Sequence, residues 1–213
     1  MKTRWIVTGL CMVVGLCAAA WAEDAAPEET SAQVPAPPPD IASDTQSQQE
    51  KRGIHKVLRF EDAMWRVEIT GAAGLHTNKR NRKDDWMGTI TVEYEVPVTG
   101  RLTAGLRLLP LLVYEQHKDK TVFAAGVGTV LRFYVLKNEY RGFYAEAEAH
   151  PMGNYPRIRG NSSHFNFLTG VGVGYKCKKN FHSSLKFEHI SNANIGRRNE
   201  GTNMLSLGVG YSF

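Results

Sequence analysis

The sequence predicts an all-β fold, specifically an eight-stranded antiparallel up-and-down transmembrane β-barrel. Two observations of the 213-residue chain predict it. Eight segments between residues 64 and 213 alternate apolar and polar side chains with a period of two, and this region shows no helical period. Long connections such as "HTNKRNRKDD" and "SNANIGRRNEGT" alternate with short ones such as "VTGR" and "CKKN", as in an even-stranded barrel. Closure also removes the edges that an open sheet would expose.

The first four strands are expected at 64–75, 87–98, 101–114 and 121–136. Each places apolar residues at every second position, with polar residues or glycine between them. Their apolar sides carry, in order, Trp65, Val67 and Ile69; Ile90, Val92 and Tyr94; Leu102, Leu106, Leu108 and Leu112; and Phe123, Val127, Leu131 and Phe133.

The last four strands are expected at 140–150, 165–177, 181–192 and 203–213. Their apolar sides carry Phe143, Ala145 and Ala147; Phe165, Phe167, Val171 and Val173; Phe181, Leu185 and Phe187; and Leu205, Leu207, Val209 and Tyr211. The final strand ends on an aromatic residue, "VGYSF", which resembles the C-terminal assembly signal of outer-membrane barrels.

Alternation alone does not say which face is outside, because a soluble barrel hides its apolar face and a membrane barrel shows it to lipid. The polar face here mixes Arg, Lys and Glu with many glycines, which suits a narrow interior filled by paired charges. The residues expected to pair there are Arg107, Arg132, Glu93, Glu95, Glu146 and Glu148. This interior, the aromatic end and the loop lengths favour the membrane barrel. A pore is not expected, since eight strands leave room only for side chains.

The N-terminal region divides into two segments. Residues 1–22 are typical of a secretory signal peptide, because a basic end precedes the apolar run "WIVTGLCMVVGLCAAA" and a small-residue cleavage pattern, "AWA". A retained membrane anchor is the alternative. Residues 23–55 are rich in Pro, Ala and Gln and predict a disordered periplasmic linker. The barrel is expected over 56–213, in the outer membrane of a Gram-negative cell after signal cleavage.

Charge and cysteine content exclude several classes of site. The formal net charge of +5 falls by two when Lys2 and Arg4 leave with the signal peptide, and the remaining +3 does not argue for nucleic-acid binding. Cys11 and Cys17 leave with it too, so Cys177 has no partner for an intramolecular disulfide. The spacing of the histidines suggests no metal site, and no cofactor is predicted.

The stretch "EHISNANIG" places two polar residues on the apolar side of the seventh strand. His189 and Ser191 share the parity of Leu185 and Phe187, and a polar pair on such a face is costly without partners or a function. With a periplasmic N-terminus this strand ends at the outer leaflet, which is lipopolysaccharide in a Gram-negative cell. A histidine two residues from a serine can activate its hydroxyl to attack an ester. Asn203 has the same outward parity at the start of the eighth strand.

The segment "HISNANIG…NEGTN" resembles the lipid A 3-O-deacylases, which are PagL-type outer-membrane esterases with His-x-Ser-Asn-Ala at the end of the seventh strand. The resemblance implies Ser191 as nucleophile and His189 as base. It also implies supporting roles for Asn192 and Asn199 in loop geometry and the oxyanion site. The third catalytic residue is Glu in the family pattern, and this chain has Asn203 there.

An asparagine can orient a histidine, but it does not stabilise an imidazolium as a carboxylate does. Glu200 in the same loop therefore remains an alternative third catalytic residue. Arg197 and Arg198, beside the same loop, are candidates for binding the phosphates of lipid A. The predicted protein is an outer-membrane esterase that removes the ester-linked 3-hydroxyacyl chain at the 3-position of lipid A. A homodimer is left open. The alternatives are a non-enzymatic barrel for adhesion or membrane integrity and a soluble ligand-binding barrel.

Overall fold

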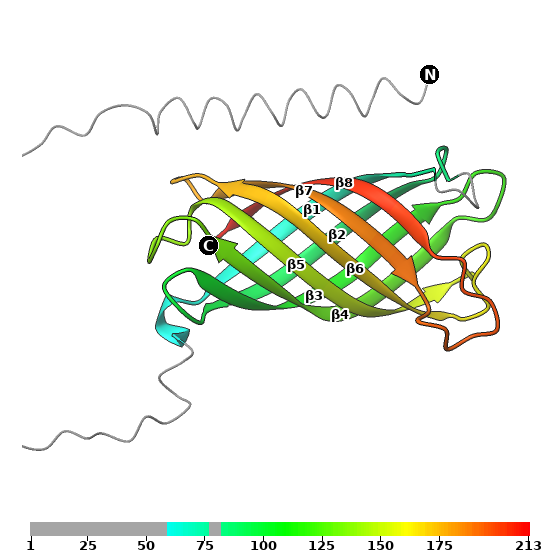
Figure 1. Cartoon of the computed structure of the whole chain (residues 1–213), viewed down its shortest axis with the longest axis horizontal. Coiled ribbons are helices and arrows are strands. Elements are labelled where there is room, and N and C mark those ends of the chain that lie inside the picture. Colours follow the sequence, from blue (N-terminus) through cyan, green and yellow to red (C-terminus); the bar gives the residue numbers. More distant parts are fainter. Residues whose placement is uncertain (1–58, 77–81) are drawn as a thin grey trace, which may run out of the picture.

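The computed structural model describes residues 59–76 and 82–213 (Figure 1). The predicted signal peptide (1–22) and linker (23–55) lie outside the described residues, as do residues 56–58 of the predicted barrel segment. No helix in the described part of the chain is long and apolar enough to cross a membrane.

Eight antiparallel strands close into a barrel in simple sequence order, with β8 paired to β1 (Figure 1). A short 3-10 helix, η2 (Phe60–Asp62), precedes them. The strands are β1 (Met64–Gly74), β2 (Trp86–Pro97), β3 (Leu102–Glu115), β4 (Val122–Tyr134), β5 (Gly142–Tyr155), β6 (Phe165–Lys176), β7 (Phe181–Ser191) and β8 (Thr202–Ser212). The predicted all-β, eight-stranded up-and-down barrel is thereby confirmed.

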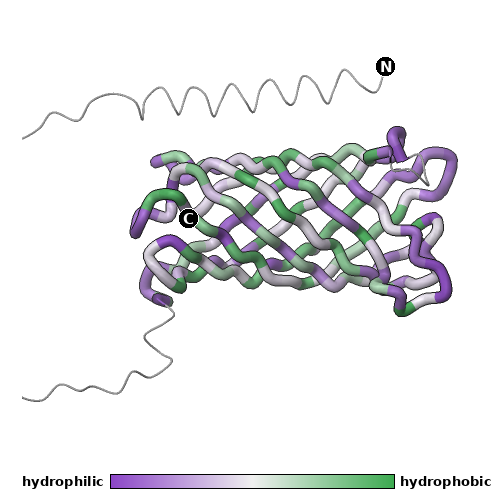
Figure 2. Tube along the Cα trace, in the orientation of Figure 1, coloured by the Kyte–Doolittle hydropathy of each residue, from purple (hydrophilic) through white to green (hydrophobic). Residues whose placement is uncertain are grey.

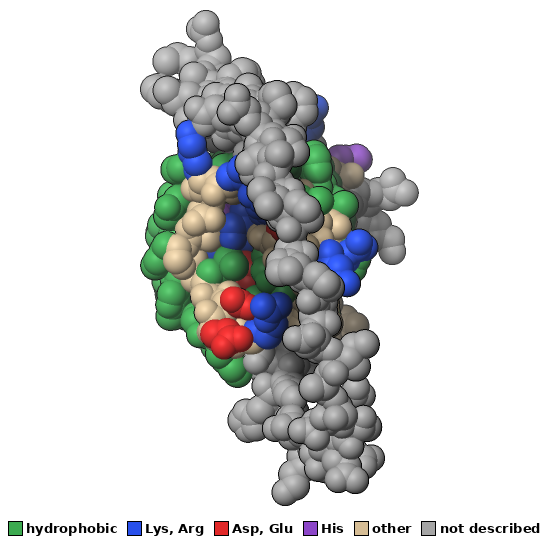
Figure 3. Space-filling view, turned by 90° about the vertical axis from the view of Figure 1, so that its left-hand side faces the viewer, with side chains coloured by type: hydrophobic (Ala, Val, Ile, Leu, Met, Phe, Trp, Pro, Cys, Tyr) green, Lys and Arg blue, Asp and Glu red, His purple; other side chains and the backbone are tan. Residues whose placement is uncertain are grey.

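Alternating side chains separate an apolar outer wall from a charged interior. Large apolar residues on the outside are widely exposed, whereas the Arg, Lys and Glu residues between them are buried. Viewed along the barrel, apolar side chains ring the wall and charged ones lie within it (Figure 3). Polar residues otherwise concentrate in the loops at the barrel ends (Figure 2). This is the arrangement of a barrel whose outer surface meets lipid.

The middle of the interior is an ion-pair network, as the sequence predicted. Arg107 contacts Glu93 at 2.7 Å and also pairs with Glu148, and Lys186 bridges Glu148 at 3.2 Å and Glu68 at 3.0 Å. These side chains are almost completely buried, so each charge depends on its partners for stabilisation.

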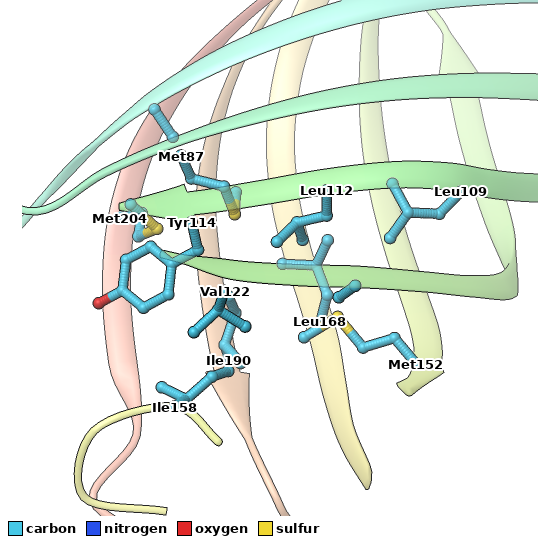
Figure 4. Close-up of a cluster of buried hydrophobic side chains, with 12 residues drawn as sticks. Met87, Leu109, Leu112, Tyr114, Val122, Met152, Ile158, Leu168, Ile190 and Met204 are labelled. Carbon is cyan, nitrogen blue, oxygen red and sulfur yellow. The ribbon is translucent and has the colours of Figure 1, made fainter. Parts of the chain in front are cut away.

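Above this network, toward the long loops, the interior becomes apolar. This plug was not predicted, because the sequence analysis assigned a polar interior throughout. Its members come from all eight strands and one loop: Ala72, Met87, Leu109, Leu112, Tyr114, Val122, Ala124, Met152, Ile158, Leu168, Ile190 and Met204 (Figure 4). Ile190 and Met204 hold the outer ends of β7 and β8 from inside.

Two details of the strand assignment were wrong. Leu112 was expected on the outer face, but it is fully buried, because a register shift between Leu109 and Leu112 inserts an extra residue and reverses the parity of β3. Pro110, which has no N–H to donate to the ladder, lies in this bulge. The strand expected at 140–150 continues to Tyr155, since the residues after Pro151 keep alternating and pair with both neighbouring strands.

The two barrel ends differ in their connections. The turns at 98–101 and 177–180 lie at one end with the C-terminus, and the longer loops 156–164 and 192–201 lie at the other (Figure 1). The segment that carries the candidate site therefore belongs to the long-loop end.

Candidate functional site

The candidate site occupies the outer ends of β7 and β8 and the 192–201 loop that joins them. His189 and Ser191 are partly exposed and share the face of the exposed Leu185 and Phe187. Ile190 between them is fully buried in the apolar plug. This anchor fixes the strand, so both polar side chains lie on the outer wall of the barrel.

His189 has a defined partner across the strand pair. It is directly opposite Asn203 in the β7–β8 ladder, and its Nδ1 lies 2.6 Å from Asn203 Oδ1. Because a carbonyl oxygen only accepts, Nδ1 of the neutral ring carries the proton and donates it. This tautomer leaves Nε2 as the basic nitrogen.

Gly201 fits against the other edge of the imidazole. A Cβ at this position would lie 2.7 Å from His189 Cε1, and the backbone has φ +46°. Both the left-handed conformation and the close approach require glycine. The His189 ring is thus held by Asn203 at Nδ1 and confined by the loop backbone.

Directly after Ser191, the chain makes a tight turn. Ile195 N–H donates to Asn192 O at 2.9 Å, and the two central residues, Ala193 and Asn194, have φ of 49° and 63°. Positive φ at both central positions defines a type I′ turn. Alanine adopts this conformation at a cost of order 1 kcal/mol, so the surrounding loop must hold it there.

Asparagine side chains supply that support. Asn199 Oδ1 accepts from Asn192 N–H at 3.0 Å, and its Nδ2 donates to Asn194 Oδ1 at 3.1 Å. Asn192 is fully buried, and its amide donates to Arg198 O at 2.8 Å. Both predicted support residues, Asn192 and Asn199, therefore hold the loop together. The backbone N–H of Asn192 already donates to Asn199 within it.

The remaining predicted residues lie in the same loop. Glu200 is partly exposed, and its backbone N–H donates to Asn161 Oδ1 at 3.0 Å. Arg197 and Arg198 are exposed at the rim. Their side chains are therefore accessible from outside the barrel.

A groove on the outer wall adjoins His189 and was missed by the sequence analysis. It has a volume of about 340 Å³ and is open to the outside. Its lining residues are Ala147, Glu148, Thr169, Gly170, Val171, Phe187 and His189. Thr169 is opposite His189 in the β6–β7 ladder, and its hydroxyl donates to His189 O at 3.3 Å. Only the strand register reveals this neighbourhood, since the lining comes from three strands.

The sequence and the fold resemble those of known proteins. A family model described as lipid A 3-O-deacylase (PagL) matches residues 105–212, which is half of the chain and includes the candidate site. The chain belongs to the lipid A 3-O-deacylase (PagL) family. No curated protein sequence matches significantly.

One solved structure supports the fold. The crystal structure of the outer membrane enzyme PagL is 16% identical with a TM-score of 0.55, and the match covers 68% of this chain and 98% of that one. The N-terminal β-barrel domain of Pseudomonas aeruginosa OprF is 15% identical with a TM-score of 0.48, covering 70% and 97%. Neisserial surface protein A is 14% identical with a TM-score of 0.46, covering 71% and 97%. Membership of the PagL family, together with the barrel, supports a lipid A deacylase function and an outer-membrane location.

Proposed function

We propose that this protein is an outer-membrane carboxylic ester hydrolase that removes the 3-hydroxyacyl chain at the 3-position of lipid A with Ser191 as nucleophile and His189 as base. The observation that carries the proposal is the hydrogen bond between His189 and Asn203, made on the outer wall two residues from Ser191. The protein reaches the membrane after cleavage of residues 1–22. There the outer wall at this end meets the lipopolysaccharide leaflet, so the ester comes to the serine without leaving the membrane.

The reaction has two balanced halves. His189 Nε2 takes the Ser191 proton while Oγ attacks the ester carbonyl carbon, and the carbonyl oxygen becomes an oxyanion. The backbone N–H of Ala193 stabilises this charge, since those of Asn192, Asn194 and Ile195 already donate within the loop. The C–O bond to the sugar then breaks, and the sugar oxygen takes the proton from His189. Water then attacks the acyl-serine with His189 again as base. The bond between the acyl carbon and Oγ breaks, Ser191 takes the proton back from His189, and the 3-hydroxy fatty acid is released.

Asn203 is proposed to hold the imidazole in its reactive tautomer. Asn203→Ala is expected to lower the rate of deacylation by about 10- to 100-fold, because the ring loses its only anchor at Nδ1 among the described residues. Asn203→Glu is expected to keep or raise the rate, because a carboxylate accepts the same hydrogen bond and stabilises the imidazolium. Initial rates on purified lipid A in detergent measure both. A complete loss with Glu means that Asn203 has a task that a carboxylate cannot perform.

The groove beside His189 is proposed to hold the first part of the scissile acyl chain. Ala147→Leu fills the groove and is expected to reduce the rate about tenfold, in line with the 1–3 kcal/mol that a methylene-sized misfit costs in a pocket. Ala145→Leu is the matched control, since Ala145 lies on the same exposed face of β5 as Ala147 but does not line the groove. Equal effects of the two substitutions on the deacylation rate would remove the groove from the substrate site.

Arg197 and Arg198 are proposed to contact the phosphates of lipid A. They are exposed in the loop that follows the serine, at the height of the headgroups. This places positive charge beside the sugar while the acyl chain lies along the wall.

The proposed function is tested by mass spectrometry of lipid A from Gram-negative cells that express the wild-type protein. The expected result is a new lipid A species that lacks one 3-hydroxyacyl chain, with the matching free 3-hydroxy fatty acid. Cells with the empty vector provide the baseline. An unchanged spectrum, with folded protein present in the outer membrane, would instead support the non-enzymatic barrel.

A further inference from the structure

The 192–201 loop is supported by a second loop that lies outside the His189–Asn203 segment. The 156–164 loop, which joins β5 to β6, runs against it, with an antiparallel bridge between Asn161 and Asn199. Ser162 N–H donates to Arg198 O at 3.1 Å, and Arg198 N–H donates to the Ser162 hydroxyl at 3.1 Å. The contact is close, because a Cβ added at Gly196 would lie 2.3 Å from Ser162 Oγ. The two loops therefore pack as one unit.

Asn161 is the centre of this contact. It is nearly buried, and both ends of its side-chain amide are used. Oδ1 accepts from Glu200 N–H at 3.0 Å, and Nδ2 donates to Asn166 Oδ1 at 2.9 Å. A side chain that is satisfied in two directions has one orientation, so it can transmit the position of one loop to the other.

The series of amides continues into the strands. Asn166 is fully buried near the start of β6, and its Nδ2 donates to Asn154 Oδ1 at 2.5 Å near the end of β5. Asn154 in turn donates to Pro156 O at 2.9 Å. Asn161 is thus anchored to β6 and β5 through two further asparagines, Asn166 and Asn154.

On its other side, Asn161 contacts two loop residues, Asn199 and Glu200, each of which is linked to a sequence neighbour or a packing neighbour of a candidate catalytic residue. Asn199, bridged to Asn161, accepts the N–H of Asn192, which follows Ser191. Glu200, held by Asn161, precedes the glycine whose backbone confines the His189 ring. A displacement of Asn161 would therefore move the loop at both ends.

We propose that Asn161 is a positioning residue that ties the 192–201 loop to β5 and β6 through Asn166 and Asn154 and so fixes Ser191 relative to His189. The proposal rests on the proposed function, and it assigns Asn161 no contact with substrate. It adds the 156–164 loop to the machinery that determines the turnover number.

The test compares Asn161→Ala, Asn161→Asp and Ser163→Ala. Alanine removes both hydrogen bonds, whereas aspartate keeps an acceptor for Glu200 N–H. Ser163 is the matched control: it lies in the same loop, and its hydroxyl accepts from Phe165 N–H within its own segment. The steady-state turnover number and KM on lipid A in detergent are measured at equal amounts of folded barrel, scored by gel mobility without heating.

Asn161→Ala is expected to lower kcat by about 10- to 100-fold with KM changed less than threefold, because misplacement of reacting groups by about 1 Å costs this much. Asn161→Asp is expected to recover part of kcat, and Ser163→Ala to match wild type. A kcat for Asn161→Ala within twofold of wild type, or a loss confined to KM, would overturn the proposal.

Amide hydrogen exchange separates this proposal from the proposed function. In Asn161→Ala the amides of residues 192–201 are expected to exchange at least about tenfold faster than in wild type and in Ser163→Ala. Faster exchange in a protein whose wild type does not deacylate lipid A would refute the proposed function and leave the support of the loop by Asn161 standing. Unchanged exchange would refute that support whatever the activity.

Discussion

Replacement of Ser191 by alanine is expected to abolish deacylation of lipid A, lowering the turnover number by at least about 10³-fold. Ser191 supplies the hydroxyl that lies two residues from the histidine base on the same face of β7. His189→Ala should be nearly as severe, because without the base the serine keeps its proton. The measurement is the initial rate of 3-hydroxy fatty acid release from lipid A by purified, refolded protein.

The double variant sharpens this prediction. Residues that act as one unit give strongly non-additive losses, so Ser191→Ala with His189→Ala should be no slower than either single variant. Ser183→Ala is a matched control, because Ser183 lies on the same face of β7 near its other end. Additive losses would show that Ser191 and His189 act separately, and an active Ser191→Ala variant would exclude the serine as nucleophile.

Removal of Arg107 is expected to destabilise the barrel by about 3–5 kcal/mol, the largest stability effect that we expect from one substitution. Arg107 is almost completely buried and is held between Glu93 and Glu148. Arg107→Ala leaves these carboxylates short of a counter-charge inside the barrel. Urea unfolding of the protein in lipid vesicles, followed by tryptophan fluorescence, measures the loss.

Two further variants test whether the loss of the buried ion pairs causes this destabilisation. Arg101→Ala removes an arginine exposed in the turn between β2 and β3 and should change the free energy of unfolding by less than about 0.5 kcal/mol. Arg107→Ala combined with Glu93→Gln should be less destabilised than the two single losses together, since both partners of one pair are neutralised. A loss below about 1 kcal/mol for Arg107→Ala would mean that water or neighbouring cations replace it.

The parity of the strands was predictable because a period of two is fixed by the backbone and every strand here separates an exposed apolar face from a packed interior. The outward positions of His189, Ser191 and Asn203 followed from that parity alone. The reversal at Leu112 did not, because a bulge beside Pro110 arises from pairing with a neighbouring strand. The same parity assigns Met87, Ile190 and Met204 to the inner face at the long-loop ends of their strands, and these apolar residues could have indicated the apolar plug.

The surroundings of the candidate site were less predictable than its motif. The sequence placed Asn192 and Asn199 in the loop, and their hydrogen bonds hold the turn after Ser191. The groove is lined by residues of three neighbouring strands, so it forms only when these strands pair in the correct register. The contact between Asn161 and Glu200 joins two loops that are distant in sequence. Such contacts depend on barrel closure, which brings these segments together only in the folded chain.

The central claim, that Ser191 is the nucleophile on the outer wall, is tested most directly by covalent labelling. Folded protein in outer-membrane vesicles is treated with a tagged fluorophosphonate, which reacts with activated serines, and the modified peptide is identified by mass spectrometry. We predict a phosphonylated Ser191 in wild type and no label there in His189→Ala. A protein that deacylates lipid A but carries the label on another residue, or loses no activity when Ser191 is fully modified, would contradict the claim.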